Sequence, residues 1–538
     1  MTHVPYVTLE SVSYQLPDGS PLFSDLDLHL DQRPTGLIGR NGVGKSILAR
    51  LIAGDLLPAS GRCLRNGSVY YLAQQVSLES ERTLADLAGV QPILCALERI
   101  GQGSTAQADF DCVGEQWNIR QQLLDQLQQN GLAHLNPSTP ASALSGGEAM
   151  RVALMGAFLS EADFLILDEP SNHLDRQHRQ ALYQQLQRWP GGLLVISHDR
   201  ELLECMERIV ELSSQGLTSY GGNLSFYAQA KDQQQQSALQ RLESAKVERK
   251  REEHALREQR ERLERRQARG KQQASGSNQA KILLDRQKER SQTSSGKLRL
   301  QQNAAHQALS AKVHLAASQV EDQQSIFVYP PVRSQNVPLQ IAELIDARLP
   351  RGAEPLQLVN LTLSRGQRVA LVGPNGCGKS TLLKVLAGQL PIISGQAHTF
   401  VTAAYLDQHL TLLEPGLSVL EQLRALNQEL NDSELRTRLA QLGLDANQVN
   451  QTCAQLSGGE RVKAAMACVL YAQQPAQLLL LDEPANHLDL PSIRALESML
   501  QQYRGTLIVT SHDEAFVDAI GITHRLEAST SGWLNISV

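Results

Sequence analysis

Short, continuous apolar runs occur in two sets, one in each half of the chain. Thr35–Gly39 and Val369–Gly373 lead directly into glycine-rich turns, as buried strands do when they enter helices. Two further pairs of apolar runs follow, and the first pair ends at Asp-Glu-Pro: Phe164–Leu167, Leu478–Leu481, Leu193–Ile196 and Leu507–Val509. These runs predict central strands, so each half is expected to be an α/β unit.

The two halves are copies of one another. Equivalent residues are first 334 and later 314 positions apart, in the pairs Lys45 and Lys379, Gln74 and Gln408, Asp168 and Asp482, and His198 and His512. From the glutamine to the following Ser-Gly-Gly, the first half has 71 residues and the second 49. The additional 22 residues lie around Gln91–Leu127, as either a small appended subdomain or a longer loop. Such a repeat predicts that the chain contains two units with the same architecture.

The segment between the halves has a different pattern. From about Phe226 to Arg269 it is rich in Gln, Glu, Arg, Lys, Leu and Ala and has no proline, which favours a long helix. A break at Gly270–Asn278 and a second helical stretch over 279–319 predict a hairpin that resembles a coiled coil. The expected domains are therefore 1–225, 226–325 for the hairpin linker and 326–538.

Charge separates this linker from the rest of the chain. The net charge is −6, yet Lys231 to Lys312 holds 20 Lys and Arg against 10 Asp and Glu, which leaves −16 elsewhere. A basic segment between acidic bodies suggests a polyanionic partner, although a solvated helical face with i,i+4 ion pairs is the alternative. No apolar run approaches the ~20 residues that span a bilayer, and the seven cysteines are scattered, so a cytosolic protein is expected.

Both glycine-rich turns match the phosphate loop G-x-x-x-x-G-K-[ST]. Its backbone N–H groups can curl around the β-phosphate of ATP, its lysine can contact the β- and γ-phosphates, and its serine can bind Mg²⁺. The expected ATP-binding residues here are Gly39, Asn41, Gly42, Gly44, Lys45, Ser46, Gly373, Asn375, Gly376, Gly378, Lys379, Ser380 and Thr381.

An Asp-Glu pair ends an apolar strand in each half. The aspartate is placed to hold Mg²⁺ and the glutamate to polarise the attacking water. The histidine of a later Ser-His-Asp is expected to read the γ-phosphate, and a glutamine to couple the metal to movement of the helical part. In chain order these residues are Gln74, Asp168, Glu169 and His198, then Gln408, Asp482, Glu483 and His512.

The core Leu-Ser-Gly-Gly-Glu occurs once in each half and completes the motif order of an ATP-binding cassette. Its serine hydroxyl and backbone N–H groups form a second phosphate-binding element, made of Ser145, Gly146, Gly147, Ser457, Gly458 and Gly459. Within one cassette this element lies too far from its own phosphate loop. We therefore expect Lys45 to pair with Ser457 and Lys379 with Ser145, with Ser171–Asp175 and Ala485–Asp489 between the two sites.

The whole chain resembles the ABC-F family, whose soluble members have two cassettes in tandem, no membrane domain and a charged helical linker. Members act on the ribosome, where they occupy the tRNA exit site and point the linker towards the peptidyl-transferase centre and P-site tRNA. The resemblance implies a cytoplasmic, monomeric ATPase that uses ATP and Mg²⁺ and binds rRNA and tRNA through its basic linker, without membrane subunits. Both a translation factor and an antibiotic ribosome-protection factor fit this pattern.

Several features qualify the resemblance. The additional residues lie where family members carry an arm, but they are few. Tyr14 is expected to stack on adenine in the first site, whereas the stretch near Ala347 offers no aromatic residue. Cys377 is either a tolerated small residue or a point of oxidation. A transporter ATPase subunit and a DNA-associated ABC ATPase are the alternative functions, and a non-catalytic scaffold would be expected to lose a catalytic Glu or His.

Overall fold

The computed structural model describes residues 6–79, 81–172, 174–274, 307–315, 317, 338–352, 354–529 and 531–537. The chain forms two compact units, one of Met1–Leu224 with Ser325–Val538 and one of Ser225–Gln324. The predicted division into three domains is finer, because both cassettes belong to the first unit, and it stays a prediction.

The first cassette contains an antiparallel sheet and a mostly parallel one. The antiparallel sheet has the order β2-β1-β4, with β1 Val7–Gln15, β2 Pro21–Leu30 and β4 Ser60–Arg65. The larger sheet has the order β5-β6-β7-β3-β8-β9, with β5 Val69–Leu72, β6 Phe164–Asp168, β7 Gly192–Ile196, β3 Thr35–Gly39, β8 Arg208–Ser213 and β9 Gly216–Gly221. Only β9 runs antiparallel to its neighbour. Every residue of β6 and β7 is buried, which explains their continuous apolar sequence.

The second cassette repeats this topology. Its antiparallel sheet has the order β11-β10-β13, with β10 Gln340–Arg348, β11 Leu358–Ser364 and β13 Ser394–Thr399. Its larger sheet has the order β14-β15-β16-β12-β17-β18, with β14 Ala403–Leu406, β15 Leu478–Asp482, β16 Thr506–Thr510, β12 Arg368–Val372, β17 His524–Ser529 and β18 Gly532–Ser537. The expectation of two α/β cassettes in tandem is confirmed.

Helices accompany the larger sheets of both cassettes. The first cassette has α1 Lys45–Ala53, α2 Leu84–Leu87, α3 Gln91–Gly101, α4 Gln107–Val113, α5 Ile119–Gln129, α6 Gly146–Leu159, α7 Arg176–Gln187 and α8 Arg200–Glu204. The second has α11 Lys379–Leu386, α12 Val419–Leu426, α13 Asp432–Gln441, α14 Ala446–Asn450, α15 Gly458–Tyr471, α16 Leu490–Gln502 and α17 Glu514–Ala519. Short 3₁₀ turns, Ala141–Ala143 and Cys453–Gln455, precede α6 and α15.

The segment Gln91–Leu127 is folded as helices α3, α4 and most of α5. Asp109 of α4 is buried and accepts from Arg99 Nε and Nη2 of α3 at 2.8 and 2.6 Å, and from Ser104 Oγ at 2.6 Å. Leu94 of α3 belongs to the same apolar cluster as residues of α2, α5 and α6. The segment is thus packed helical structure rather than a longer loop, and its role as an arm stays a prediction.

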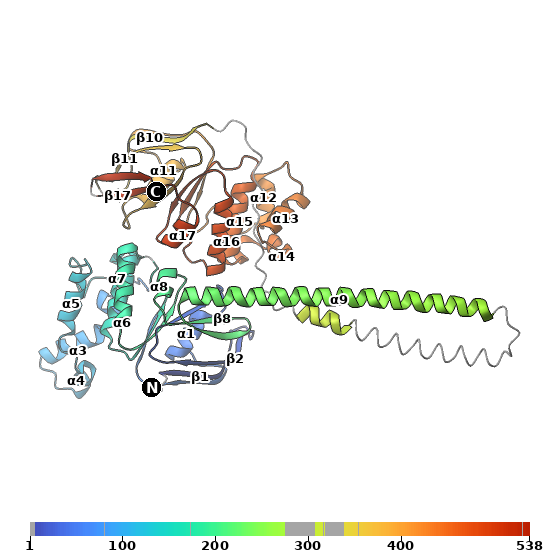
Figure 1. Ribbon diagram of the computed structural model, residues 1–538. Coiled ribbons are helices and arrows are strands. Elements are labelled where there is room, and N and C mark those ends of the chain that lie inside the picture. Colours follow the sequence, from blue (N-terminus) through green and yellow to red (C-terminus); the bar gives the residue numbers. More distant parts are fainter. Residues whose placement is uncertain are drawn as a thin grey trace. The chain divides into compact units, whose positions relative to one another are not determined.

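A single helix, α9 Leu224–Ala274, begins the linker and runs for 51 residues (Figure 1). The first residues of the predicted break, Gly270 to Ala274, belong to this helix, so the break does not begin where we expected it. One glycine costs a helix only about 1 kcal/mol, so Gly270 does not end it. Residues 307–315 are also helical, and Lys312 Nζ lies 2.6 Å from Glu248 Oε2 of α9, as a hairpin requires. The remainder of the predicted break, including most of the tip, lies outside the described residues. No helix in the described part of the chain is long and apolar enough to cross a membrane.

Candidate active sites

The two phosphate loops are folded alike and hold their lysines in the same way. Lys45 Nζ donates to the carbonyl oxygens of Gly39 and Arg40 at 2.8 and 3.1 Å, and Lys379 Nζ does the same within its own loop at 2.8 and 3.0 Å. Both lysines are 9% exposed. The glycine before each lysine has a φ of +101° or +107°, a backbone conformation that favours glycine. Each lysine is therefore folded back over its loop, at the start of a helix.

The strand-end aspartates are buried beside hydroxyl groups. Asp168 is 1% exposed, its carboxylate accepts from Tyr71 Oη at 3.3 Å, and the nearby Ser46 side chain favours its ionised form. Burial is the largest influence on Asp168 and raises its pKa. A carboxylate and a serine hydroxyl side by side form the hard oxygen donor set that Mg²⁺ prefers, so these residues fit that ion.

In the second cassette the aspartate has different partners. Asp482 accepts from Tyr405 Oη and from Thr510 Oγ1, both at 2.9 Å. Ile196 stands at the position of Thr510 in the first cassette and offers no hydroxyl. The sequence interpretation missed these partners, although Tyr71 and Tyr405 show the same separation of 334 residues as the glutamines.

Each candidate catalytic glutamate follows its aspartate in a left-handed backbone conformation. Glu169 has a φ of +50° and Glu483 one of +49°, and non-glycine residues with such angles cluster at functional sites. The Glu169 N–H donates to Ile196 O at 2.8 Å, and the Glu483 N–H donates to Thr510 O at 3.1 Å. Neighbouring strands thus hold both glutamates at the carboxyl edge of the sheet, where open α/β sheets bind ligands.

A histidine faces each of these glutamates. Nε2 lies 3.8 Å from Oε1 in the pair His198 and Glu169, and 3.3 Å in the pair His512 and Glu483. Burial raises the pKa of Glu169 to about 8 and of Glu483 to about 7, and it lowers the pKa of both histidines to about 3. Both imidazoles are therefore neutral at physiological pH.

Some buried polar atoms of these pairs form no hydrogen bond. Among the described residues, both ring nitrogens of His198 and Oε1 of Glu483 are buried and accept or donate no hydrogen bond. Buried polar groups are normally satisfied. Their orphaned state fits a site that receives a polar group such as a phosphate or a water.

The predicted second phosphate-binding elements cap two helices. Ser145 is the N-cap of α6, and its hydroxyl donates to Glu148 Oε2 at 2.7 Å. Ser457 is the N-cap of α15, and its backbone N–H donates to Glu460 Oε2 at 2.8 Å. In both cases a capping box orients the serine at the positive end of a helix of 14 residues. Gly146 and Gly147 are the first two residues of α6, and Gly458 and Gly459 are the first two of α15. A Cβ added to Gly146 would meet no atom within 4 Å.

The phosphate loop of the first cassette contacts the segment before α16. The Asn41 N–H donates to Asp489 Oδ2 at 3.0 Å, and Asn41 Nδ2 donates to His487 O at 2.8 Å. A Cβ placed on Gly458 would lie 3.8 Å from Asn41 Nδ2. The loop that carries Lys45 is thus close to the start of α15, which is the arrangement required for Lys45 to share a ligand with Ser457.

The remaining predicted residues lie around this framework. Gln74 and Gln408 are exposed two positions after β5 and β14, and in the described part of the chain neither forms a side-chain hydrogen bond with its aspartate. Tyr14 is half-buried with its ring 6.1 Å from that of Phe23, which in turn lines Gly44 of the phosphate loop. Asn375 Oδ1 lies 3.3 Å from His512 Nε2. His173, within the predicted Ser171–Asp175 segment, lies outside the described residues.

The sequence of this chain matches a known family of proteins. The family described as ABC transporter matches residues 24–172 and 356–486. Probable ATP-binding protein YheS of Haemophilus influenzae is 31% identical over 508 residues, which cover 90% of this chain and 73% of YheS. The chain belongs to the ABC-F family. This ABC-F protein is an ATPase of the ABC type.

Two further relatives extend the comparison. Ribosome protection protein VmlR of Bacillus subtilis is 29% identical to this ABC-F protein over 521 residues, which cover 95% of this chain and 85% of VmlR. The archaeal ribosome recycling factor aABCE1, solved in complex with the ribosomal stalk protein aP1, aligns with a TM-score of 0.59 and 17% identity over 98% of this chain and 90% of that one. At that identity the likeness shows a shared fold.

Proposed function

We propose that this ABC-F protein binds two ATP molecules, each with Mg²⁺, in two composite sites. The Lys45 site consists of Lys45, Ser46, Asp168, Glu169 and His198 with Ser457 and Asp489 of the second cassette. The Lys379 site consists of Lys379, Ser380, Asp482, Glu483 and His512 with Ser145 and Asp175 of the first cassette. The contacts of Asn41 with Asp489 and His487 support this pairing.

The side chains of each site have separate roles in hydrolysis. The lysine leaves its loop carbonyls to contact phosphate oxygens, and the aspartate with the loop serine supplies oxygen ligands to the Mg²⁺, which neutralises phosphate charge when bound. The glutamate, whose pKa lies near neutrality, orients and deprotonates the attacking water. The neutral histidine can donate to the γ-phosphate from one ring nitrogen. Gln74 and Gln408 would approach the metal only when the helical part moves, and Tyr14 would stack on adenine.

We further propose that closure of the two cassettes on ATP directs the linker at ribosomal RNA. The observation that carries this proposal is the similarity to VmlR, which spans 95% of this chain and so includes the linker. In this proposal the protein is a cytoplasmic monomer that binds at the tRNA exit site. Its basic linker then reaches P-site tRNA and the peptidyl-transferase region, as a translation factor or as an antibiotic-protection factor. Exposed Lys and Arg of α9 provide the phosphate contacts that such a partner rewards.

Co-sedimentation with ribosomes tests this function. Glu169→Gln with Glu483→Gln removes both candidate bases while the side-chain shape is kept, so the doubly substituted protein should remain bound to ribosomes in ATP and dissociate in ADP. The wild-type protein in ATP is the matched control, and it should be released as it hydrolyses. Absence of ATP-dependent binding to ribosomes, with duplex DNA binding instead, would overturn the ribosomal proposal in favour of a DNA-associated ATPase.

A further inference from the structure

The two cassettes differ at one residue in the turn that leads to α7 and α16. Asp175 and Asp489 are equivalent N-caps, 314 residues apart, and each accepts from the backbone N–H three residues later, at 3.1 and 3.0 Å. That residue is His178 in the first cassette and Ser492 in the second. The imidazole adds a contact that a serine cannot make, because its Nδ1 lies 2.5 Å from Asp175 Oδ1.

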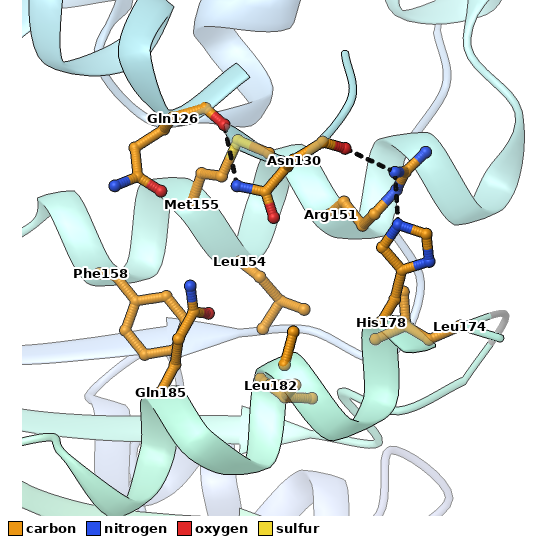
Figure 2. Close-up of a pocket in the computed structure, with 11 residues that line it drawn as sticks. Gln126, Asn130, Arg151, Leu154, Met155, Phe158, Leu174, His178, Leu182 and Gln185 are labelled. Atoms are coloured by element: carbon orange, nitrogen blue, oxygen red, sulfur yellow. Dashed lines mark hydrogen bonds between the residues drawn. The ribbon is translucent and has the colours of Figure 1, made fainter. Parts of the chain in front are cut away.

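The other side of the His178 ring is held by α6. Arg151 Nη1 lies 2.8 Å from His178 Nε2 and donates to Asn130 O at 2.9 Å (Figure 2). Since Arg151 can only donate, Nε2 is the acceptor and Nδ1 carries the proton that Asp175 accepts. The result is a continuous relay from Asp175 through His178 and Arg151 to the end of α5.

The second cassette has an aspartate and a basic residue at the equivalent positions, but it has no histidine between them. Lys463 stands at the position of Arg151, and its Nζ donates to Gly443 O at 3.0 Å. Ser492 instead packs on α15 itself, since a Cβ on Gly459 would lie 1.9 Å from Ser492 Oγ. In the first cassette, therefore, α6 and α7 are connected through the hydrogen bonds of His178. In the second cassette, the equivalent helices α15 and α16 contact each other directly.

The relay is partly shielded from water and acts on the charge of Asp175. The Asp175 side chain is 13% exposed and that of His178 is 30% exposed. Burial opposes ionisation of Asp175, but the hydrogen bonds from the backbone and ring of His178 outweigh it and lower the pKa of Asp175 below its ordinary value. A cavity of about 30 Å³, lined by Asn130, Arg151 and His178, adjoins the relay and has room for roughly one water.

We infer that His178 is a positioning residue of the Lys379 site and has no counterpart in the Lys45 site. Ser145 heads α6, which carries Arg151. Arg176, the residue after Asp175, lies 2.8 Å from Glu514, which is two residues after His512 in the second cassette. His178 thus links the two first-cassette groups that the proposed function assigns to the Lys379 site, and in that assignment the inference rests on the proposed function. Without the imidazole ring, Asp175 is no longer connected to α6, so its position in the Lys379 site becomes less well defined.

Turnover of ATP by each site separately tests this role in the full chain. Glu169→Gln leaves only the Lys379 site active, and Glu483→Gln leaves only the Lys45 site active. His178→Ala should lower kcat about 10-fold in the Glu169→Gln protein, as removal of an orienting hydrogen-bond partner does, with a smaller change in KM. In the Glu483→Gln protein it should change kcat less than about twofold.

Two variants control for folding and for simple loss of packing. His178→Gln keeps a donor and an acceptor on one side chain and should restore part of kcat, whereas Ser492→Ala should leave turnover in the Glu169→Gln protein unchanged. Equal losses in both backgrounds, or a loss that follows a lower Tm and that His178→Gln does not relieve, would overturn the inference. The readout needs no ribosomes, so failure of ribosome binding would leave this comparison intact.

Discussion

The backbone N–H of Asn41 donates to the carboxylate of Asp489 at 3.0 Å, although 448 residues separate the two. Asn41 lies in the phosphate loop of one cassette and Asp489 at the N-cap of α16 in the other. A loop residue is thus tied to the opposite cassette through its main chain, so the bond does not depend on the side chain at position 41.

This bond predicts an asymmetric effect of changes at Asp489. Asp489→Ala removes a charged acceptor worth about 1.5 kcal/mol or more, so ATP turnover should fall about 10-fold in the Glu483→Gln protein, where only the Lys45 site acts. Asp489→Asn keeps an oxygen for the Asn41 N–H and for the α16 cap and should give an intermediate rate. A similar loss in the Glu169→Gln protein would point to general destabilisation and contradict the prediction.

Tyr71 and Tyr405 donate to the two strand-end aspartates, so replacing either tyrosine should raise the Mg²⁺ concentration that ATP turnover requires. Tyr405 Oη donates to Asp482 at 2.9 Å and Tyr71 Oη to Asp168 at 3.3 Å, so Tyr405→Phe should have the larger effect. Loss of such a partner typically costs about 10-fold in metal affinity, so the half-saturating Mg²⁺ for turnover should rise by a similar factor with Tyr405→Phe. Tyr70→Phe, on the same strand as Tyr71, is the matched control, and an equal shift with it would refute the assignment.

Burial of the two glutamates predicts a dependence of stability on pH in the nucleotide-free, Mg²⁺-free protein. The pKa of Glu169 is about 8 and that of Glu483 about 7, both above the ordinary value of 4.5. Between 4.5 and these values the folded state retains protons that the unfolded state has released, so the free energy of unfolding falls as pH rises.

Thermal denaturation in EDTA measures this effect. Glutamine cannot ionise, so Tm of the Glu169→Gln/Glu483→Gln protein should fall less than that of the wild type from about pH 6 to about pH 9. Glu243→Gln with Glu252→Gln removes the same charge from exposed positions of α9 and should leave the wild-type slope. If Tm changes with pH in the same way in the wild type and in the Glu169→Gln/Glu483→Gln protein, the two buried carboxyl groups do not titrate in this range.

The exposed basic residues of α9 predict a salt-dependent contribution to ribosome binding. Lys250, Arg251 and Arg257 are exposed, and their joint replacement by Gln should weaken co-sedimentation and lower the slope of log K against log salt by up to about three, while ATP turnover stays unchanged. Gln233, Gln236 and Gln240 are also exposed on α9, and their replacement by Glu changes the net charge equally. Equal weakening by the two sets would mean that net charge, rather than the position of the basic residues, governs binding.

Much of the fold could be predicted because the relevant signals are local. Continuous apolar runs gave the central strands, and glycine spacing before Lys45 and Lys379 gave the loops, since only glycine accepts a φ near +100° there without strain. The duplicated motifs also placed Asp168 and Glu169 correctly at the end of β6.

Other features depend on tertiary contacts and so escaped sequence interpretation. Thr510 and Tyr405 reach Asp482 from adjacent strands. The repeat of Tyr71 at Tyr405 marks an equivalent position, but it does not indicate which residue the tyrosine contacts. The packed pair α3 and α4 depends on a bond between Arg99 and Asp109 that spacing alone does not indicate. His178 resembles any surface histidine until the ring is seen between Asp175 and Arg151.

The uninterrupted length of α9 makes it a lever. At about 1.5 Å per residue, its 51 residues extend for about 77 Å. A rigid turn of about 5° at Leu224 therefore displaces the far end by about 7 Å, more than the pitch of one helical turn. A continuous helix of this length therefore turns a small change of angle at one end into a large displacement at the other.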